Sequence, residues 1–184
     1  MADRNGLFQV SLMNVFRQAA QQRDAKAVGA KTTDDGGRVL SARTIERREG
    51  AAQTTLRDNL AQDLSNLMGT IHLEAAMSLE GFDRVKKSVL NYGMQDMTRL
   101  TSEDFQNAKV IRDLRTALLD HEPRLIAETL VVKLRTAQVD EHQRIAFDIR
   151  AEMTARPVDV PIEFVAEIDT GAGKVAMSNL VVRG

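Results

Sequence analysis

A regular two-residue alternation of apolar and polar side chains between residues 144 and 153 constrains the fold of this chain more than any other feature. The apolar members are Ile145, Phe147, Ile149, Ala151 and Met153. Successive side chains of a β-strand point to opposite faces of a sheet, so this alternation predicts a strand with one buried and one solvated face. Each buried side chain of this kind contributes about 1.5–3 kcal/mol, so this strand alone is able to anchor a sheet.

Segments on both sides of this strand continue the β pattern. Residues 126–134 and 162–168 also alternate, and a short return strand is predicted to begin at Val175. A turn cluster, Asp169-Thr170-Gly171-Ala172-Gly173, precedes that return strand. Such short connections favour an antiparallel meander of three to four strands. The preceding helices must cover its apolar face, so the predicted class is α+β, with N-terminal helices packed on a small antiparallel β-meander.

Two helices are predicted ahead of the meander. Between residues 51 and 68 leucines recur at helical spacing, and Gly69 follows as a C-terminal cap. These leucines are Leu56, Leu60, Leu64 and Leu67. The second helix is predicted to begin at Thr101 or Ser102, either of which is a good N-cap, and to end before Pro123.

The segment between these helices, residues 69–97, is irregular in period apart from one compact apolar group. Leu90 and Tyr92 of this group are expected in the core, and Gly93 is expected to supply a positive φ at a turn. Packing explains these residues better than contact with a partner.

The first 23 residues carry an apolar stripe at helical spacing that includes Phe8, Leu12 and Phe16. Residues 24–37 have almost nothing to bury and end in two glycines, which is typical of a linker. The chain is therefore predicted to comprise an N-terminal helical arm, a flexible linker and an α+β domain, at residues 1–23, 24–42 and 43–184. The stripe has two interpretations: burial on the chain's own sheet, or a tethered helix that enters a groove on another subunit.

The composition argues against several classes of function. With 25 basic and 26 acidic side chains, the net charge of −1 is too balanced for a dedicated binder of nucleic acid or anionic membranes. The sequence has no cysteine, which excludes disulfides, a thiolate nucleophile and cysteine-ligated metals. It also lacks a phosphate-binding glycine loop and a nucleophile elbow.

No catalytic residue, cofactor or metal site is predicted. His121 and His142 are flanked by acidic residues, but neighbours in sequence point different ways and do not converge on a metal, so both are expected to be solvated. No apolar run approaches the length of about 20 residues that crosses a membrane, and no leader opens the sequence. A cytoplasmic protein is therefore expected.

Glu122-Pro123-Arg124, at the end of the second predicted helix, has two interpretations. In the first, the proline only ends the helix, and the two charged side chains form an exposed pair worth less than about 1 kcal/mol. In the second, the proline fixes the direction of the chain and Glu122 holds Arg124 in place. The planar guanidinium of Arg124 would then bind an acidic or carbonyl-rich partner.

Three segments carry a resemblance to a known family. They are Leu56–Leu60 running on to Leu67–Thr70, Ser88–Met97, and Glu122-Pro123-Arg124. In this order and spacing they resemble TssE, the family of baseplate subunits of bacterial type VI secretion systems. That family is similar in turn to the sheath-initiating baseplate proteins of contractile phage tails. The resemblance extends from about Thr44 to Val182, and departs from the family pattern at Gln95, where proline is usual.

The resemblance implies a structural role without catalysis or a cofactor. Members of the family join the baseplate wedge and present a small sheet on which the first ring of contractile sheath assembles. The implied partners are the wedge proteins TssF, TssG and TssK and the sheath proteins TssB and TssC. An open edge of the sheet would receive an extended arm of a sheath subunit by strand addition.

Two sets of residues are therefore candidates for partner binding. The family's wedge-docking motif carries over to Glu122, Pro123 and Arg124, and Arg124→Ala is expected to abolish docking while the monomer stays folded. The second set, from the N-terminal stripe, is Phe8, Leu12 and Phe16.

Two other functions remain open. A lysozyme-like peptidoglycan hydrolase would need two carboxylates that face one cleft, with one of them kept protonated by apolar surroundings. A small regulatory module would instead form a one-to-one complex with a single soluble partner.

Overall fold

The computed structural model describes residues 6–21, 23, 46, 50–98, 108–135, 144–169 and 171–183, apart from the side chain of Val15. The predicted linker, the predicted helix start at Thr101 or Ser102, and His142 lie outside these residues. The chain forms two compact units: one of residues 1–59 and 155–157, the other of residues 60–154 and 158–184. The domain boundary predicted at residue 43 also falls outside the described residues and stays a prediction.

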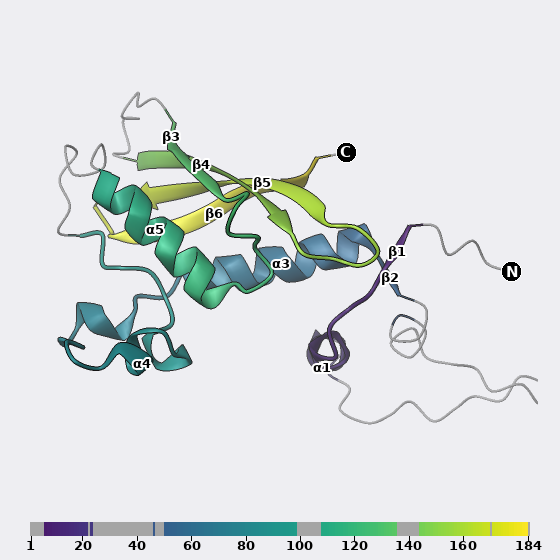
Figure 1. Cartoon of the computed structure of the whole chain (residues 1–184), viewed down its shortest axis with the longest axis horizontal. Helices are drawn as coiled ribbons and strands as arrows, with labels where there is room; N and C mark the ends of the chain where they lie inside the picture. Colours follow the sequence, from purple (N-terminus) through teal and green to yellow (C-terminus); the bar gives the residue numbers. More distant parts are fainter. Residues whose placement is uncertain are drawn as a thin grey trace, which may run out of the picture. The chain divides into compact units, whose positions relative to one another are not determined.

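The second unit is built on four antiparallel strands that are adjacent in space in the order β3-β4-β5-β6 (Figure 1). Their bounds are β3 Val131–Leu134, β4 Arg144–Met153, β5 Val160–Asp169 and β6 Lys174–Val182. β4 and β5 pair over their whole length, with Ile149 opposite Phe164. The predicted α+β class and the antiparallel meander are confirmed.

The alternation along the strands separates the two faces of this sheet. One face is apolar and buried, and Phe147 and Phe164 at its centre have no exposed surface. On the other face charged side chains pair across strands, as Arg135 does with Asp148 at 2.6 Å between Nη2 and Oδ1. The core therefore lies on one side of the sheet only.

The first strand of the sheet is shorter than predicted. Within residues 126–134, Thr129 closes a turn, because its N–H and its hydroxyl donate to the carbonyl of Ile126 at 3.1 and 2.9 Å. Only the residues from Val131 onward form β3. The chain before the turn still touches β4 through a bridge between Leu125 and Met153.

Two long helices supply the other half of the core. α3 (Gln53–Met68) begins in the first unit, and in the second unit it buries Leu60, Leu64, Leu67 and Met68. α5 (Ala108–His121) packs on β3 and buries Val110, Leu114 and Leu118. Figure 1 shows α5 lying along the sheet. α5 ends two residues before Pro123, as the sequence predicts.

Between α3 and α5, residues 69–98 form a folded segment of short helical turns, called here the loop segment. It contains the elements η1 Leu73–Ala75, α4 Asp83–Lys86 and η2 Val89–Asn91. Its two ends are hydrogen-bonded to each other: Met94 N–H donates to the Thr70 carbonyl at 2.8 Å, and His72 N–H donates to the Met94 carbonyl at 2.9 Å. The loop segment is therefore closed at its base.

Gly93 makes this closure possible. Its φ is +131°, which confirms the positive φ predicted for it, and an added Cβ would lie 2.6 Å from the carbonyl oxygen of Thr70. A side chain at this position would collide with backbone, which has little freedom to move.

The first unit contains β1 (Leu7–Phe8) paired antiparallel with β2 (Ala51–Ala52), and the helix α1 (Met13–Gln21). Phe8 therefore lies in a strand rather than in the predicted helix, and it is buried opposite Ala51. The helical part of the stripe begins only at Met13.

We predict that Gly93→Ala destabilises the chain more than Gly81→Ala does. Both glycines have a positive φ, but nothing lies within 4 Å of a Cβ at Gly81. Gly81→Ala should cost about 1–2 kcal/mol for the backbone conformation alone, and Gly93→Ala about 1–3 kcal/mol more for the collision. Denaturant unfolding of the two variants measures this difference, and equal losses would contradict the steric role of Gly93.

Candidate docking site

The Glu122-Pro123-Arg124 triplet forms a corner directly after α5. Glu122 is 4% exposed, and its carboxylate accepts hydrogen bonds from Arg124: from N–H and Nε to Oε1 at 3.2 and 2.7 Å, and from Nη2 to Oε2. Pro123 between them is exposed. The prediction that Glu122 holds the guanidinium is confirmed, and the interpretation of the triplet as two solvated charges is wrong.

A second carboxylate, from α3, completes the corner. Arg124 Nη2 donates to Asp63 Oδ2 at 2.5 Å, so one guanidinium joins the end of α5 to the middle of α3. The Arg124 carbonyl accepts from Thr154 N–H at 2.8 Å, which adds the end of β4 to the same point. Arg124 thus ties together three elements of the second unit.

The charges explain why this guanidinium stays protonated. Burial alone would lower the pKa of Arg124, but the hydrogen bond to Glu122 and the charges of Glu122 and Asp63 outweigh it and raise the pKa above its ordinary value. Nε and Nη2 are satisfied inside the chain. The fork predicted to bind a partner is therefore largely occupied by the chain's own carboxylates.

Tyr92 brings the loop segment to the same corner. Its hydroxyl donates to the backbone carbonyl of Asp63 at 3.3 Å, and its ring meets the ring of His121 edge to face, with centroids 5.4 Å apart. His121 is half-buried, so the prediction that it is merely solvated is wrong. The three sequence segments that carry the family resemblance converge here.

Asp63 is the member of this network that sequence reasoning missed. It lies three residues after Leu60 and four before Leu67, at the border of the leucine stripe. A carboxylate at such a border is half-buried, and a half-buried carboxylate is usually paired with a cation. The place of Asp63 at the border of the stripe was the available sign of a buried ion pair, but its partner Arg124 is 61 residues away in the sequence.

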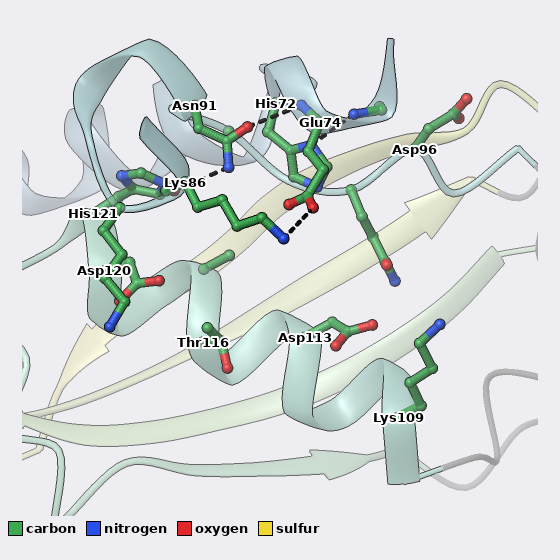
Figure 2. A pocket seen from close by; sticks show the side chains of 15 residues that line it. His72, Glu74, Lys86, Asn91, Asp96, Lys109, Asp113, Thr116, Asp120 and His121 are labelled. Carbon is green, nitrogen blue, oxygen red and sulfur yellow. Dashed lines mark hydrogen bonds and ion pairs between the residues drawn. The ribbon is translucent and has the colours of Figure 1, made fainter. Parts of the chain in front are cut away.

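Asn91, rather than Leu90, points into the interior of the loop segment. Asn91 is buried, its Oδ1 accepts from Glu74 N–H at 2.9 Å, and its Nδ2 donates to the Lys86 carbonyl at 3.0 Å (Figure 2). The predicted burial of Leu90 is wrong because the short helical turn η2 directs Asn91 inward and leaves Leu90 69% exposed.

The loop segment exposes large apolar side chains as well as charged ones. Five large apolar side chains there are at least half exposed, up to 84% for Val89. This exposed apolar surface consists of Ile71, Met77, Phe82, Val89 and Leu90. Exposed apolar side chains on a segment whose interior is hydrogen-bonded are a candidate surface for protein–protein contact.

A cavity of about 640 Å³ lies between the loop segment and α5 (Figure 2). Its charged and ionisable lining comes from both walls and includes His72, Glu74, Lys86, Lys87, Asp96, Lys109, Asp113, Asp120 and His121. Lys86 Nζ lies 2.8 Å from Glu74 Oε1, and this hydrogen bond raises the pKa of Lys86 above its ordinary value. Within the described ranges, no three histidine or carboxylate side chains come together in a way that could hold a metal ion.

The candidate residues of the N-terminal stripe separate into two kinds. Phe8 is buried inside the first unit, whereas Leu12 and Phe16 are 61% and 60% exposed. The inward face of α1 is polar instead: Asn14 is buried and accepts at Oδ1 from Asn59 Nδ2 at 3.1 Å. The helix therefore turns its apolar face outward.

No helix in the described part of the chain has the length and apolar character needed to cross a membrane.

We predict that Arg124→Ala destabilises the second unit by about 2–3 kcal/mol, because it leaves Glu122 buried without its cation. This is below the usual cost of breaking a fully buried pair, since the Arg124 side chain is 32% exposed. The matched control is Arg112→Ala, an exposed arginine on α5, which should cost less than about 0.5 kcal/mol. Chemical unfolding compares the two, and equal stability would contradict the structural role of the corner.

We also predict a pH dependence from Tyr92, the one tyrosine of the chain. Burial first, and then the charges of Asp63 and Glu122, raise its pKa above the ordinary value of 10.0. The folded chain therefore holds this proton more tightly than the unfolded chain, so stability falls as the pH rises past 10.0. Ultraviolet titration should place the phenol midpoint above that of the unfolded chain, and Asp63→Asn should lower it; coincident midpoints for the folded and unfolded chain would contradict the network.

Comparison with known proteins finds one family whose model covers the corner. The family model described as baseplate wedge protein gp25 matches residues 54–158, more than half of the chain. This range includes Asp63, Tyr92, Glu122 and Arg124. No curated protein and no solved structure matches the chain. The resemblance seen in the sequence is confirmed at the level of the family: the chain belongs to the family of the baseplate wedge protein gp25.

Proposed function

We propose that the chain is the TssE-like baseplate subunit of a type VI secretion system, acting in the cytoplasm. It docks onto a wedge that contains TssF, TssG and TssK, and its sheet starts the sheath of TssB and TssC by strand addition. Family membership gives the coarser statement directly, a structural role in a phage-tail-like baseplate and association with other baseplate proteins. The finer statements rest on the open sheet, the loop segment, the corner and the N-terminal arm.

The observation that carries the proposal is the open sheet of the second unit. β3 and β6 are its outer strands, and among the described residues no strand pairs with the outer side of either. An edge strand presents free N–H and C=O groups that accept an extended segment of another protein. A subunit on which a filament of other subunits begins needs such an unfinished edge.

Wedge docking is proposed for the loop segment and the corner together. The exposed apolar surface supplies the buried part of the contact, as aromatic and aliphatic side chains do at protein interfaces. Glu122 and Arg124 act chiefly by fixing the corner beside Tyr92, while Pro123 and the outer side of Arg124 remain exposed to a partner. A surface that is rigid before binding loses less entropy on binding.

The arm makes a second proposed contact. Leu12, just before α1, and Phe16 on α1 are exposed, and neither is needed to bury the other face of that helix, which is polar. We place them in a groove of another baseplate subunit. Phe8 supports this contact indirectly, by holding β1 against β2.

The proposal includes the absence of catalysis. A hydrolase needs a carboxyl group that can hold a proton near neutral pH, and apolar surroundings provide for that. Asp63 and Glu122, the carboxylates of the corner, are instead both hydrogen-bonded to the cation Arg124.

We predict that Val89→Asp and Leu90→Asp abolish recovery of the wedge. Each variant of the full chain is purified from the native cytoplasm, and the co-purified proteins are identified by mass spectrometry. A charge in the centre of an apolar contact should lower the recovered wedge proteins by about tenfold or more. Val158→Asp is the matched control, because Val158 is a valine of the second unit that is 61% exposed and lies outside the loop segment.

Two outcomes would count against these claims. Unchanged recovery with both aspartate variants would rule out the exposed apolar surface as the docking site. Absence of wedge and sheath proteins from the wild-type purification, or cleavage of purified peptidoglycan by the chain, would rule out the function itself.

A further inference from the structure

We propose that the cavity between the loop segment and α5 binds two basic side chains of a wedge subunit, one at Asp113 and one at Asp120. This inference rests on the proposed wedge docking and adds a second, charged contact to it. Three properties of the cavity support it: two carboxylates without a cation, basic groups that are engaged elsewhere, and a position beside the exposed apolar surface.

The two carboxylates lie on the side of α5 that lines the cavity (Figure 2). Asp120 comes seven residues after Asp113, which is two helical turns, or about 10 Å along the helix axis. Thr116 and Ala117, which line the cavity between them, have short side chains. This wall of the cavity therefore presents two carboxylates with a shallow stretch between them.

Neither carboxylate has a partner in the described part of the chain. The side chains of Asp113 and Asp120 form no ion pair and no hydrogen bond with any described residue. On the facing wall, in contrast, Glu74 Oε1 lies 2.8 Å from Lys86 Nζ. Asp113 is also half-buried, so its charge is partly removed from water, and a cation would compensate that loss.

The position of Asp120 in the helix favours a cation independently of the cavity. Asp120 lies in the last turn of α5, which ends at His121. The carbonyl groups at the carboxyl end of a helix carry partial negative charge, so an acidic side chain is unfavourable there and a cation is favourable. A basic side chain at this point would interact with the carboxylate and with the helix end together.

The basic groups of the cavity do not neutralise these two aspartates. Lys86 is paired with Glu74, and Nδ1 of His72 accepts a hydrogen bond from Ala75 N–H at 3.1 Å, so this nitrogen carries no proton. With the histidines neutral, three lysines and four carboxylates leave the lining with one net negative charge. The lysines are Lys86, Lys87 and Lys109, and the carboxylates are Glu74, Asp96, Asp113 and Asp120.

The cavity is continuous in sequence with the exposed apolar surface. Ile71 and Leu90 belong to that surface, and the residues that follow them, His72 and Asn91, line the cavity. A wedge subunit that covers the exposed apolar surface therefore lies beside the cavity. Protein interfaces commonly combine an apolar centre with charged groups at its border, and complementary charges there add specificity.

The spacing of the two aspartates defines the segment that fits. Two basic side chains about 10 Å apart are three residues apart in an extended segment or seven residues apart in a helix. Arginine suits the site best, because its planar guanidinium can donate two hydrogen bonds to one carboxylate. The occupant is thus an arginine- or lysine-bearing segment of a wedge subunit, held in a cavity of about 640 Å³.

The first test removes the two charges without changing the shape of the side chains. The double variant Asp113→Asn, Asp120→Asn is compared with the double variant Glu128→Gln, Glu152→Gln. The control also removes two charges from the second unit, but Glu128 and Glu152 are exposed and lie outside the lining of the cavity. The dissociation constant of the purified wedge proteins is measured for each full-length chain over a series of salt concentrations.

We expect the asparagine variant to bind the wedge proteins about tenfold or more weakly, with a smaller dependence on salt, and the control to bind as the wild type does. Urea unfolding should give the same midpoint for the asparagine variant and the wild type, because neither aspartate has a partner within the described residues.

The second test locates the partner. The chain has no cysteine, so Thr116→Cys places a single thiol at an exposed position between the two aspartates. Binding of the wedge proteins should slow labelling of this thiol by a maleimide about tenfold or more. Labelling that is already slow in the isolated chain would show that the chain fills its own cavity, and would overturn the assignment to a partner.

Three further outcomes are decisive. Wild-type affinity of the asparagine variant, or unchanged labelling of the Thr116→Cys variant in the complex, would overturn this inference and leave docking through the exposed apolar surface standing. Calorimetric binding of spermidine to the wild type but not to the asparagine variant, with unchanged affinity for the wedge, would assign the cavity to a soluble polyamine instead. Failure of the wild-type chain to bind the wedge proteins would overturn the proposed function, and this inference with it.

Discussion

The contact between the Arg124 guanidinium and the carboxylates of Asp63 and Glu122 is the interaction on which the second unit depends. Glu122 is almost completely buried, and a buried carboxylate costs several kcal/mol unless a cation and hydrogen bonds compensate it. Arg124 provides both through three donors, and its carbonyl also receives the end of β4. Because α3, α5 and β4 meet at one residue, their positions relative to one another are set by charge and geometry and not by apolar packing alone. Apolar packing tolerates small shifts, whereas a planar guanidinium between two carboxylates does not.

The outer edge of the sheet, in contrast to the corner, has groups that the described chain leaves without a partner strand. The corner is complete within the chain, but β6 leaves Met177 and Val182 half-exposed and presents eight uncharged residues at its border. An edge of this kind favours aggregation if it stays empty, so it is useful only where a partner covers it. A baseplate subunit needs both kinds of surface. In the proposed function, the finished corner gives a fixed attachment and the unfinished edge accepts the next subunit.

Sequence reasoning found the parts of this structure that depend on local patterns. The alternation around Phe147 gave the strand and its buried face, and Pro123 gave the end of α5. It failed where a residue's environment depends on distant parts of the chain. Leu90 looked like a core residue, but the three-residue turn η2 has room for one inward side chain, and Asn91 takes it because its amide satisfies two backbone groups. Asp63 was overlooked because nothing in its neighbourhood shows that an arginine 61 residues later will reach it.

The same difference separates the hydrogen-bonded residues of the corner from the exposed apolar surface proposed for docking. Asp63, Tyr92 and Arg124 are bound to one another inside the monomer, so a change in any of them disturbs the fold whatever the partner is. Val89 and Leu90 contribute little to the monomer, because most of their surface is in water. Their identity can follow the partner without cost to the fold. In the proposed function, the mutually bonded residues hold the scaffold, and recognition of a particular wedge is left to the exposed apolar residues that the scaffold holds in place.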